Sequence, residues 1–274
     1  MIEFLHKTLD AFAGLGPVRE LRKKRFEKEF AGHVEGGYGG NLYRGVFNTF
    51  EEAQQSSPPG KPIGYDNQAA ADLYLERTRR VYAADYPVMF WLEKLFQSGA
   101  KSVFEFGGHI GIAYYGYRKY VSYPPGLKWC VHDVPAVVAR GRELAVKLDT
   151  HKLLSFADSY TEADGFDVYF SAGALQYHPK TLAEMLSELR VLPRYVLLNL
   201  IPLHPSATFY TVQSMMTSYS PYRVSQYGKY MEDLVKLGYT QRDGWENPDK
   251  KCLIAFDEEH SIDRYYGCLF ERRA

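Results

Sequence analysis

The segment from Val103 to Ile112 constrains the fold more than any other part of the chain. It reads Val-Phe-Glu-Phe-Gly-Gly-His-Ile-Gly-Ile, an apolar strand that runs through Glu105 into a glycine-dense turn. Glycine lets the main chain come close to a ligand, and the first turn of a following helix offers unpaired N–H groups. A strand, such a turn and a helix in this order are typical of a nucleotide site in an α/β protein.

After residue 100, predicted strands and helices alternate, which favours a mostly parallel sheet with helices on both faces. Strands are expected at 102–106, 128–132, 153–156, 166–171 and 195–200, and helices from 113 to about 120 and at 137–147, 181–189 and 229–237. The strand at 195–200 is the most apolar and is expected to be central. The extended pieces 239–245, 252–256 and 265–270 lack helices between them and predict an antiparallel end to the sheet.

Residues 1–99 are expected to form a helical and loop extension that can act as a lid, and residues 100–274 to form the nucleotide-binding domain. Within the extension, helices are expected over 1–30, from Asp66 to about Ala84, and after Pro87. The highly charged part of the first helix is interpreted as a solvated face. A basic helix lying on anionic lipid is the alternative.

Composition excludes several classes of function. Lys+Arg and Asp+Glu both number 33, so no net charge recruits nucleic acid. The three cysteines are scattered without the spacing of a metal site or a disulfide framework, which predicts no metal and a reducing, cytoplasmic location. No apolar run approaches the about 20 residues that span a bilayer, and no signal-peptide pattern is expected at the N-terminus. The sequence is compatible with a homodimer.

The glycine spacing indicates which nucleotide the turn accepts. The dinucleotide fingerprint G-x-G-x-x-G, started at Gly107, needs glycine where the chain has His109 and Ile112. With Gly108 and Gly111 as its last two glycines, its first position falls on Phe106. The spacing therefore disfavours a nicotinamide-dependent oxidoreductase. A phosphate-binding P-loop is excluded because no Gly-Lys-[Ser/Thr] follows the turn.

The arrangement Glu105-x-Gly107-Gly108-x-x-Gly111 resembles motif I of class I S-adenosylmethionine-dependent methyltransferases. The resemblance implies a Rossmann-like α/β fold, with a mostly parallel seven-stranded sheet whose C-terminal strand is antiparallel. It also implies that the acid holds the α-amino group of the cofactor, while the turn packs on its sugar and methionine tail. His109 departs from the motif, because most class I enzymes have glycine there. It either packs beside the turn, contacts the cofactor or the substrate, or marks a degenerate pocket.

Further acids fall where this fold needs them. Asp133 ends the second strand, with Val134 after it, and an acid there can accept hydrogen bonds from both ribose hydroxyls. Its context, Asp-Val-Pro-Ala-Val-Val, resembles a signature of small-molecule O-methyltransferases. Asp158 and Ser159 follow the third strand, where the resemblance places an acid against the adenine amino group. Ser171 ends the fourth strand, which the resemblance turns toward cofactor and substrate.

Longer stretches resemble a family of bacterial class I methyltransferases that are often encoded near polysaccharide or other cell-envelope biosynthesis genes. Together they span most of residues 40–274 and include 43–53, 64–66, 104–115, 133–138, 171–177, 220–223 and 245–248. The resemblance implies fold and cofactor and leaves the acceptor undefined.

Two histidines are candidates for the general base of a methyl transfer to a hydroxyl. In plant-type O-methyltransferases the base follows the fourth strand, and the matching position here is Gln176, which cannot act as one. His178 lies two residues further on, and His204 follows the fifth strand. Loops at the carboxyl ends of parallel strands face the active site, which favours both.

Aromatic-rich segments at 41–50, 65–86 and 218–227 either cover the substrate or pack the N-terminal helices on the sheet. Arg44 and Arg223, within them, can pair with an anionic group of a substrate.

The sequence therefore predicts S-adenosylmethionine-dependent methyl transfer to a small molecule or a glycan, most simply on a hydroxyl oxygen. The alternative is a non-catalytic methyltransferase-like protein that acts as a binding or scaffold subunit. A nicotinamide-dependent oxidoreductase is less favoured.

Overall fold

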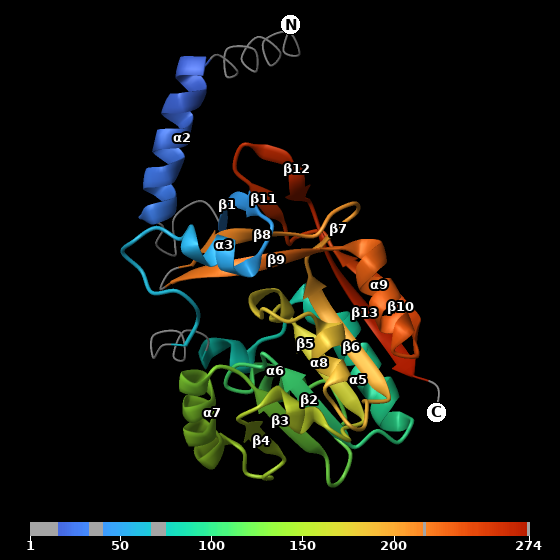
Figure 1. Ribbon diagram of the computed structural model, residues 1–274. Helices are drawn as coiled ribbons and strands as arrows, with labels where there is room; N and C mark the ends of the chain where they lie inside the picture. Colours follow the sequence, from blue (N-terminus) through green and yellow to red (C-terminus); the bar gives the residue numbers. More distant parts are fainter. Residues whose placement is uncertain (1–15, 33–40, 67–74, 216–217, 273–274) are drawn as a thin grey trace, which may run out of the picture.

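The computed structural model describes residues 16–32, 41–66, 75–215 and 218–272, which form two β-sheets with helices packed around the larger one (Figure 1). Among these residues, no helix combines the length and the apolar character that crossing a membrane requires.

The larger sheet has seven strands in the order β10-β13-β6-β5-β2-β3-β4. They are β2 (Ser102–Phe106), β3 (Lys128–His132), β4 (Leu154–Ala157), β5 (Val168–Ala172), β6 (Tyr195–Ile201), β10 (Tyr239–Asn247) and β13 (Tyr265–Arg272). Neighbours pair in parallel except β13, which is antiparallel to both β6 and β10. The predicted mostly parallel sheet with an antiparallel C-terminal strand is confirmed. The strand predicted to be central, β6, lies next to the middle strand, β5. Every interior strand of a sheet is apolar, so apolar character alone does not identify the middle one.

Alternating side chains of the strands build a core on each face of this sheet. Val103 packs with one group of buried residues and Phe104 with another, as the two-residue period of a strand requires. Helices α5 (Tyr86–Gln97), α6 (Ile112–Tyr117) and α7 (Pro135–Leu148) cover the first face, and α8 (Leu182–Ser187) and α9 (Tyr227–Lys236) cover the second. The four helices predicted after residue 100 are confirmed, although α6 ends at Tyr117 and α7 begins earlier, at Pro135. Proline suits the first turn of a helix.

The chain reverses its direction of progress across the sheet between β2 and β5. From β2 it moves outward to β3 and β4, and from β5 it moves the opposite way to β6. The turn after β2 and the loop after β5 therefore meet at one point above the carboxyl ends of the strands. A Cβ atom at Gly107 would lie 2.0 Å from the Cβ atom of Ala174, which measures how closely the two segments pack. Open α/β sheets bind ligands at such a switch point.

A second, six-stranded sheet was not expected from the sequence. Its order is β12-β11-β1-β8-β9-β7. The strands are β1 (Leu42–Phe47), β7 (Leu203–His204), β8 (Phe209–Ser214), β9 (Tyr219–Gln226), β11 (Cys252–Ile254) and β12 (Asp257–Ile262). Strand β1 pairs with β8 and β11, so residues before 99 share a sheet with residues after 200. The division into units of 1–99 and 100–274 stays a prediction.

Helix α2 (Gly16–Ala31) extends from the body, and near its C-terminal end the Phe30 ring stacks on Tyr219 at 5.5 Å (Figure 1). Residues 1–15 of the predicted first helix, and 67–74 of the helix predicted from Asp66, lie outside the described residues. After them come only two short helices of 3-10 type, 75–79 and 83–85, with a non-helical break at 80–82, so the prediction of a continuous helix to about Ala84 is wrong in its described part. Helix α3 (Phe50–Gln55) precedes them.

Candidate functional site

The glycine turn after β2 has a local reason for its glycines. Gly107 has φ +73°, in the left-handed region that favours glycine, and its missing side chain makes room for Ala174. A Cβ atom at Gly108 would lie 2.4 Å from the Cδ atom of Glu105, so the main chain passes directly over that carboxyl group. Gly111 then caps the N-terminus of α6.

His109 occupies the position that departs from the glycine motif. Its φ is +55°, a conformation that histidine tolerates better than most residues. Its main-chain N–H donates to Oδ2 of Asp133 over 2.8 Å, and its buried ring contacts the ring of Tyr65, with centroids 6.0 Å apart. Histidine therefore keeps the backbone shape that glycine would give, and its ring packs beside the turn.

Glu105 lies beneath this turn and is buried. Its Oε2 accepts a hydrogen bond of 2.7 Å from Nε1 of Trp129 on β3. Burial raises the pKa of Glu105 to about 8, because a charged carboxylate loses its hydration there. The hydrogen bond from Trp129 opposes this shift, and the nearby carboxyl group of Asp133 adds to it. The site therefore holds a carboxyl group that is mostly neutral at pH 7.

Asp133 lies at the end of β3 and fastens it to the turn. Besides the bond from His109, its Oδ1 accepts a 2.8 Å hydrogen bond from the N–H of Val134, which caps α7. Burial raises the pKa of Asp133 to about 6, while the two main-chain N–H groups oppose that rise. Each carboxylate oxygen has two lone pairs, so both can still accept a hydrogen bond from a ligand hydroxyl.

The other predicted cofactor contacts lie in different surroundings. The Asp158 side chain is 78% exposed and forms an ion pair of 2.9 Å with Arg142. Ser159 caps the 3-10 helix 160–163. The buried hydroxyl of Ser171 donates to the main-chain oxygen of Phe106 over 2.9 Å, so it ties β5 to β2. Contact of these three residues with a cofactor stays a prediction.

His178 lies in the loop between β5 and α8, above the carboxyl end of β2. Its ring contacts Phe106 and Tyr160 edge to face, with centroids 5.7 and 5.6 Å apart. Its Nδ1 lies 3.2 Å from the main-chain N of Lys180 and 3.4 Å from the Lys180 oxygen. Burial, and at longer range the charge of Arg223, lower the pKa of His178, so the ring is neutral at pH 7.

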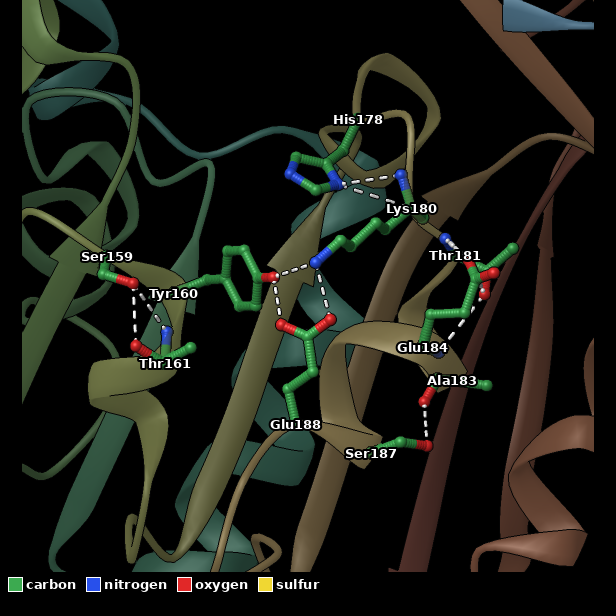
Figure 2. Close-up of polar contacts among 10 residues, drawn as sticks. All are labelled: Ser159, Tyr160, Thr161, His178, Lys180, Thr181, Ala183, Glu184, Ser187 and Glu188. Carbon is green, nitrogen blue, oxygen red and sulfur yellow. Dashed lines mark hydrogen bonds and ion pairs between the residues drawn. The ribbon is translucent and has the colours of Figure 1, made fainter.

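A polar network below His178 was not foreseen from the sequence. Figure 2 shows the Tyr160 hydroxyl between the side chains of Lys180 and Glu188. Tyr160 donates to Glu188 over 2.5 Å and accepts from Nζ of Lys180 over 2.9 Å. Lys180 also forms an ion pair of 2.5 Å with Glu188. The network fixes the loop of His178 against α8 and the segment after β4. Only spatial proximity joins these residues, because 28 positions separate Tyr160 from Glu188.

His204 is placed in the second sheet instead of the turn region. Its Nδ1 accepts from the main-chain N–H groups of Ser206 and Ala207 at 3.2 and 3.1 Å. The proton must then be on Nε2, which lies 2.9 Å from the main-chain oxygen of Glu259 and donates to it. His204 thus joins β7 to β12, the two edge strands of that sheet. A role as general base stays untested, and this geometry favours a structural one.

The two arginines predicted to pair with a substrate anion differ in their surroundings. Arg44 donates to the main-chain oxygen of Ser56 and forms an ion pair of 3.4 Å with Glu27 of α2, so it fastens the N-terminal helix to β1. Arg223 on β9 is 3% exposed and donates to main-chain oxygens in the loop of His178. The aromatic residues of 41–50 and 218–227 pack in the second sheet and on α2.

No model of a known protein family matches this chain, and no curated protein matches it. Solved structures do. A 1,6-didemethyltoxoflavin-N1-methyltransferase from Burkholderia thailandensis, solved with S-adenosylhomocysteine, is 14% identical, with a TM-score of 0.47 over 74% of this chain and 82% of that chain. A magnesium protoporphyrin IX methyltransferase from Synechocystis PCC 6803, solved with bound S-adenosylmethionine, is 12% identical, with a TM-score of 0.45 over 77% and 86%.

An O-methyltransferase family protein from Burkholderia thailandensis is 13% identical, with a TM-score of 0.47 over 75% of this chain and 60% of that chain.

The sheet thus gathers a glycine turn, the buried carboxyl group of Glu105, the half-buried one of Asp133 and a neutral histidine at its switch point. The structure brings together Glu105, Gly107, Gly108, His109, Asp133 and Val134, and His178 lies on the neighbouring loop. Their contact with a cofactor stays a prediction. Such a set can accept hydrogen bonds from sugar hydroxyls and can attract a cationic group. Of these groups, the neutral imidazole of His178 is the best suited to accept a proton from a hydroxyl.

Proposed function

We propose that this chain transfers a methyl group from S-adenosylmethionine to a small-molecule acceptor. The observation that carries the proposal is the joining of Asp133 to the glycine turn through the N–H of His109, at the switch point of the seven-stranded sheet. An acid at the end of the strand next to such a turn accepts hydrogen bonds from ribose hydroxyls. The glycine spacing argues against a dinucleotide, and the same spacing resembles motif I of class I methyltransferases.

The residues at the turn fit this cofactor in chemistry as well as in position. Gly107 and Gly108 have no side chains, so a cofactor can approach the main chain of the turn closely. Asp133 keeps lone pairs for the ribose, and the neutral Glu105 below the turn can release its proton when the cationic α-amino group approaches. When bound, the cofactor supplies an electrophilic methyl group on a sulfonium centre.

His178 is the residue that we assign to the acceptor. If its Nδ1 accepts the N–H of Lys180, the proton stands on Nε2 and the ring can only donate to an acceptor oxygen. If Nδ1–H donates to the oxygen of Lys180, Nε2 becomes free to take a proton from a hydroxyl. The base role therefore requires the second tautomer. Because a histidine that is free at Nε2 can take the proton that a hydroxyl loses, we propose a hydroxyl acceptor on a small molecule or a glycan.

One observation favours a second candidate function. The hydroxyl of Ser171 and the carboxyl of Glu105 both have partners inside the protein, so two predicted ligand contacts are engaged within the fold. A non-catalytic methyltransferase-like subunit would have such a site.

Calorimetric titration separates these candidates. We expect S-adenosylhomocysteine to bind and NADH to give no heat of binding at the same concentrations. Absence of binding at millimolar S-adenosylhomocysteine would contradict the proposed cofactor. Binding without methyl transfer, when labelled S-adenosylmethionine is offered with pooled hydroxylated acceptors, would favour the non-catalytic subunit.

A further inference from the structure

A cleft separate from the glycine turn opens between α8, α9 and the second sheet. Its volume is about 80 Å³, below the about 300–1,000 Å³ of sites that enclose a whole drug-sized ligand, so only a small group can enter it. Its polar lining includes Thr181, Thr208, Arg223, Lys229, Tyr230 and Asp233. Thr181 follows the loop that bears His178, so this cleft and the candidate site are on two sides of one loop.

Arg223 is the central feature of the cleft. It is 3% exposed, and its guanidinium donates to the main-chain oxygens of Leu175, Pro179 and Lys180 over 3.1, 3.2 and 3.1 Å. These carbonyl groups use three of its five N–H groups but carry no formal charge, and at longer range the charge of Arg223 helps to lower the pKa of Glu184. Within the described part of the chain, Arg223 forms no ion pair with a carboxylate. A buried charge is ordinarily paired, because losing its hydration is costly.

The rest of the lining is consistent with an anionic partner for Arg223. Lys229 stands at the cleft with its side chain 57% exposed, paired with Asp233 one helical turn away. Because the charges of Lys229 and Asp233 cancel, the net charge of the lining residues is the positive charge of Arg223. The Tyr230 hydroxyl is buried in the wall and makes no hydrogen bond to the described residues.

We propose that this cleft binds the oxyanion group, a carboxylate or a phosphate, of a small molecule, with Arg223 as its principal partner. A planar guanidinium suits both groups because its N–H donors match two oxygens at once. Identifying that molecule as the methyl acceptor rests on the function proposed above. The anion site itself rests on Arg223 and on the lining of the cleft.

The test is a titration with inorganic phosphate, at constant ionic strength made up with chloride, followed by amide chemical shifts. We expect saturable shifts around 223 and 229 in the wild type and none in Arg223→Gln. Asp233→Asn removes the negative charge from the lining and should tighten phosphate binding about 2–5-fold, the scale of one partly exposed charge pair. A misfolded variant could not produce this gain. Glu232→Gln removes a charge from the same helix outside the cleft and should leave the affinity unchanged.

Phenyl phosphate distinguishes the sources of the anion. Tighter binding than phosphate supports an anionic group on a larger molecule, and equal binding supports a free anion. No saturable shifts in the wild type, or equal changes in Asp233→Asn and Glu232→Gln, would overturn the site. Because these titrations contain no S-adenosylmethionine, they can succeed where the proposed methyl transfer fails, and the reverse.

Discussion

Replacing Glu105 with glutamine isolates the buried carboxyl group below the glycine turn. Glutamine has nearly the same size, and its side-chain oxygen can still accept the hydrogen bond from Nε1 of Trp129. The variant therefore removes the titration and keeps the packing. The difference in unfolding free energy between wild type and variant should then depend on pH through this one group.

The sign follows from where the proton is held. The folded protein keeps the Glu105 proton up to pH values near its raised pKa of about 8, whereas the unfolded chain releases it near its ordinary value of 4.5. The stabilisation is therefore complete below the unfolded pKa and is lost as pH rises through the folded one. Linkage gives a loss of about 2–3 kcal/mol from pH 5 to pH 7, and about 1 kcal/mol more by pH 9, for the wild type relative to Glu105→Gln.

Urea unfolding followed by tryptophan fluorescence at pH 5, 7 and 9 measures this difference, with Trp129 next to the substituted group. Glu258→Gln, the same change at an exposed residue of β12, should follow the wild-type curve at each pH. If the wild-type and Glu105→Gln curves stay parallel from pH 5 to pH 9, Glu105 is not held neutral and the reasoning fails.

Three further substitutions test the assigned roles. Asp133→Ala should weaken S-adenosylhomocysteine binding by about 1–3 kcal/mol, because the ribose loses a charged acceptor; calorimetry against the exposed control Asp263→Ala decides, and equal affinities would remove Asp133 from the site. His178→Asn should lower kcat by about 100-fold. In the wild type, kcat/KM should fall at acid pH, at a pH below the ordinary histidine pKa because burial lowers the pKa of His178, and the variant should lose this fall. An unchanged pH profile would exclude His178 as the base. His204→Ala should cost about 1–3 kcal/mol in urea unfolding, because buried main-chain groups lose their partners; unchanged stability would contradict its role between β7 and β12.

The sequence by itself determined the seven-stranded sheet and the turn. Five parallel strands were placed to within two residues at each end, because interior strands need apolar residues on both faces and the glycines punctuate them. The approach of Asp133 to the glycine turn was also predictable. Neighbouring parallel strands end at the same edge of a sheet, so their terminal residues must meet.

Only the tertiary structure decided the rest. Strand β1 pairs with β8 across more than 150 residues of chain, which no local pattern reports. The same is true of His204, whose hydrogen bonds depend on a strand 55 residues away, and of Tyr160 beside Lys180. Local sequence fixes which residues form a strand and where a turn falls. Which nitrogen of a histidine carries the proton, and whether an arginine is buried, depends on neighbours that only the folded chain brings together.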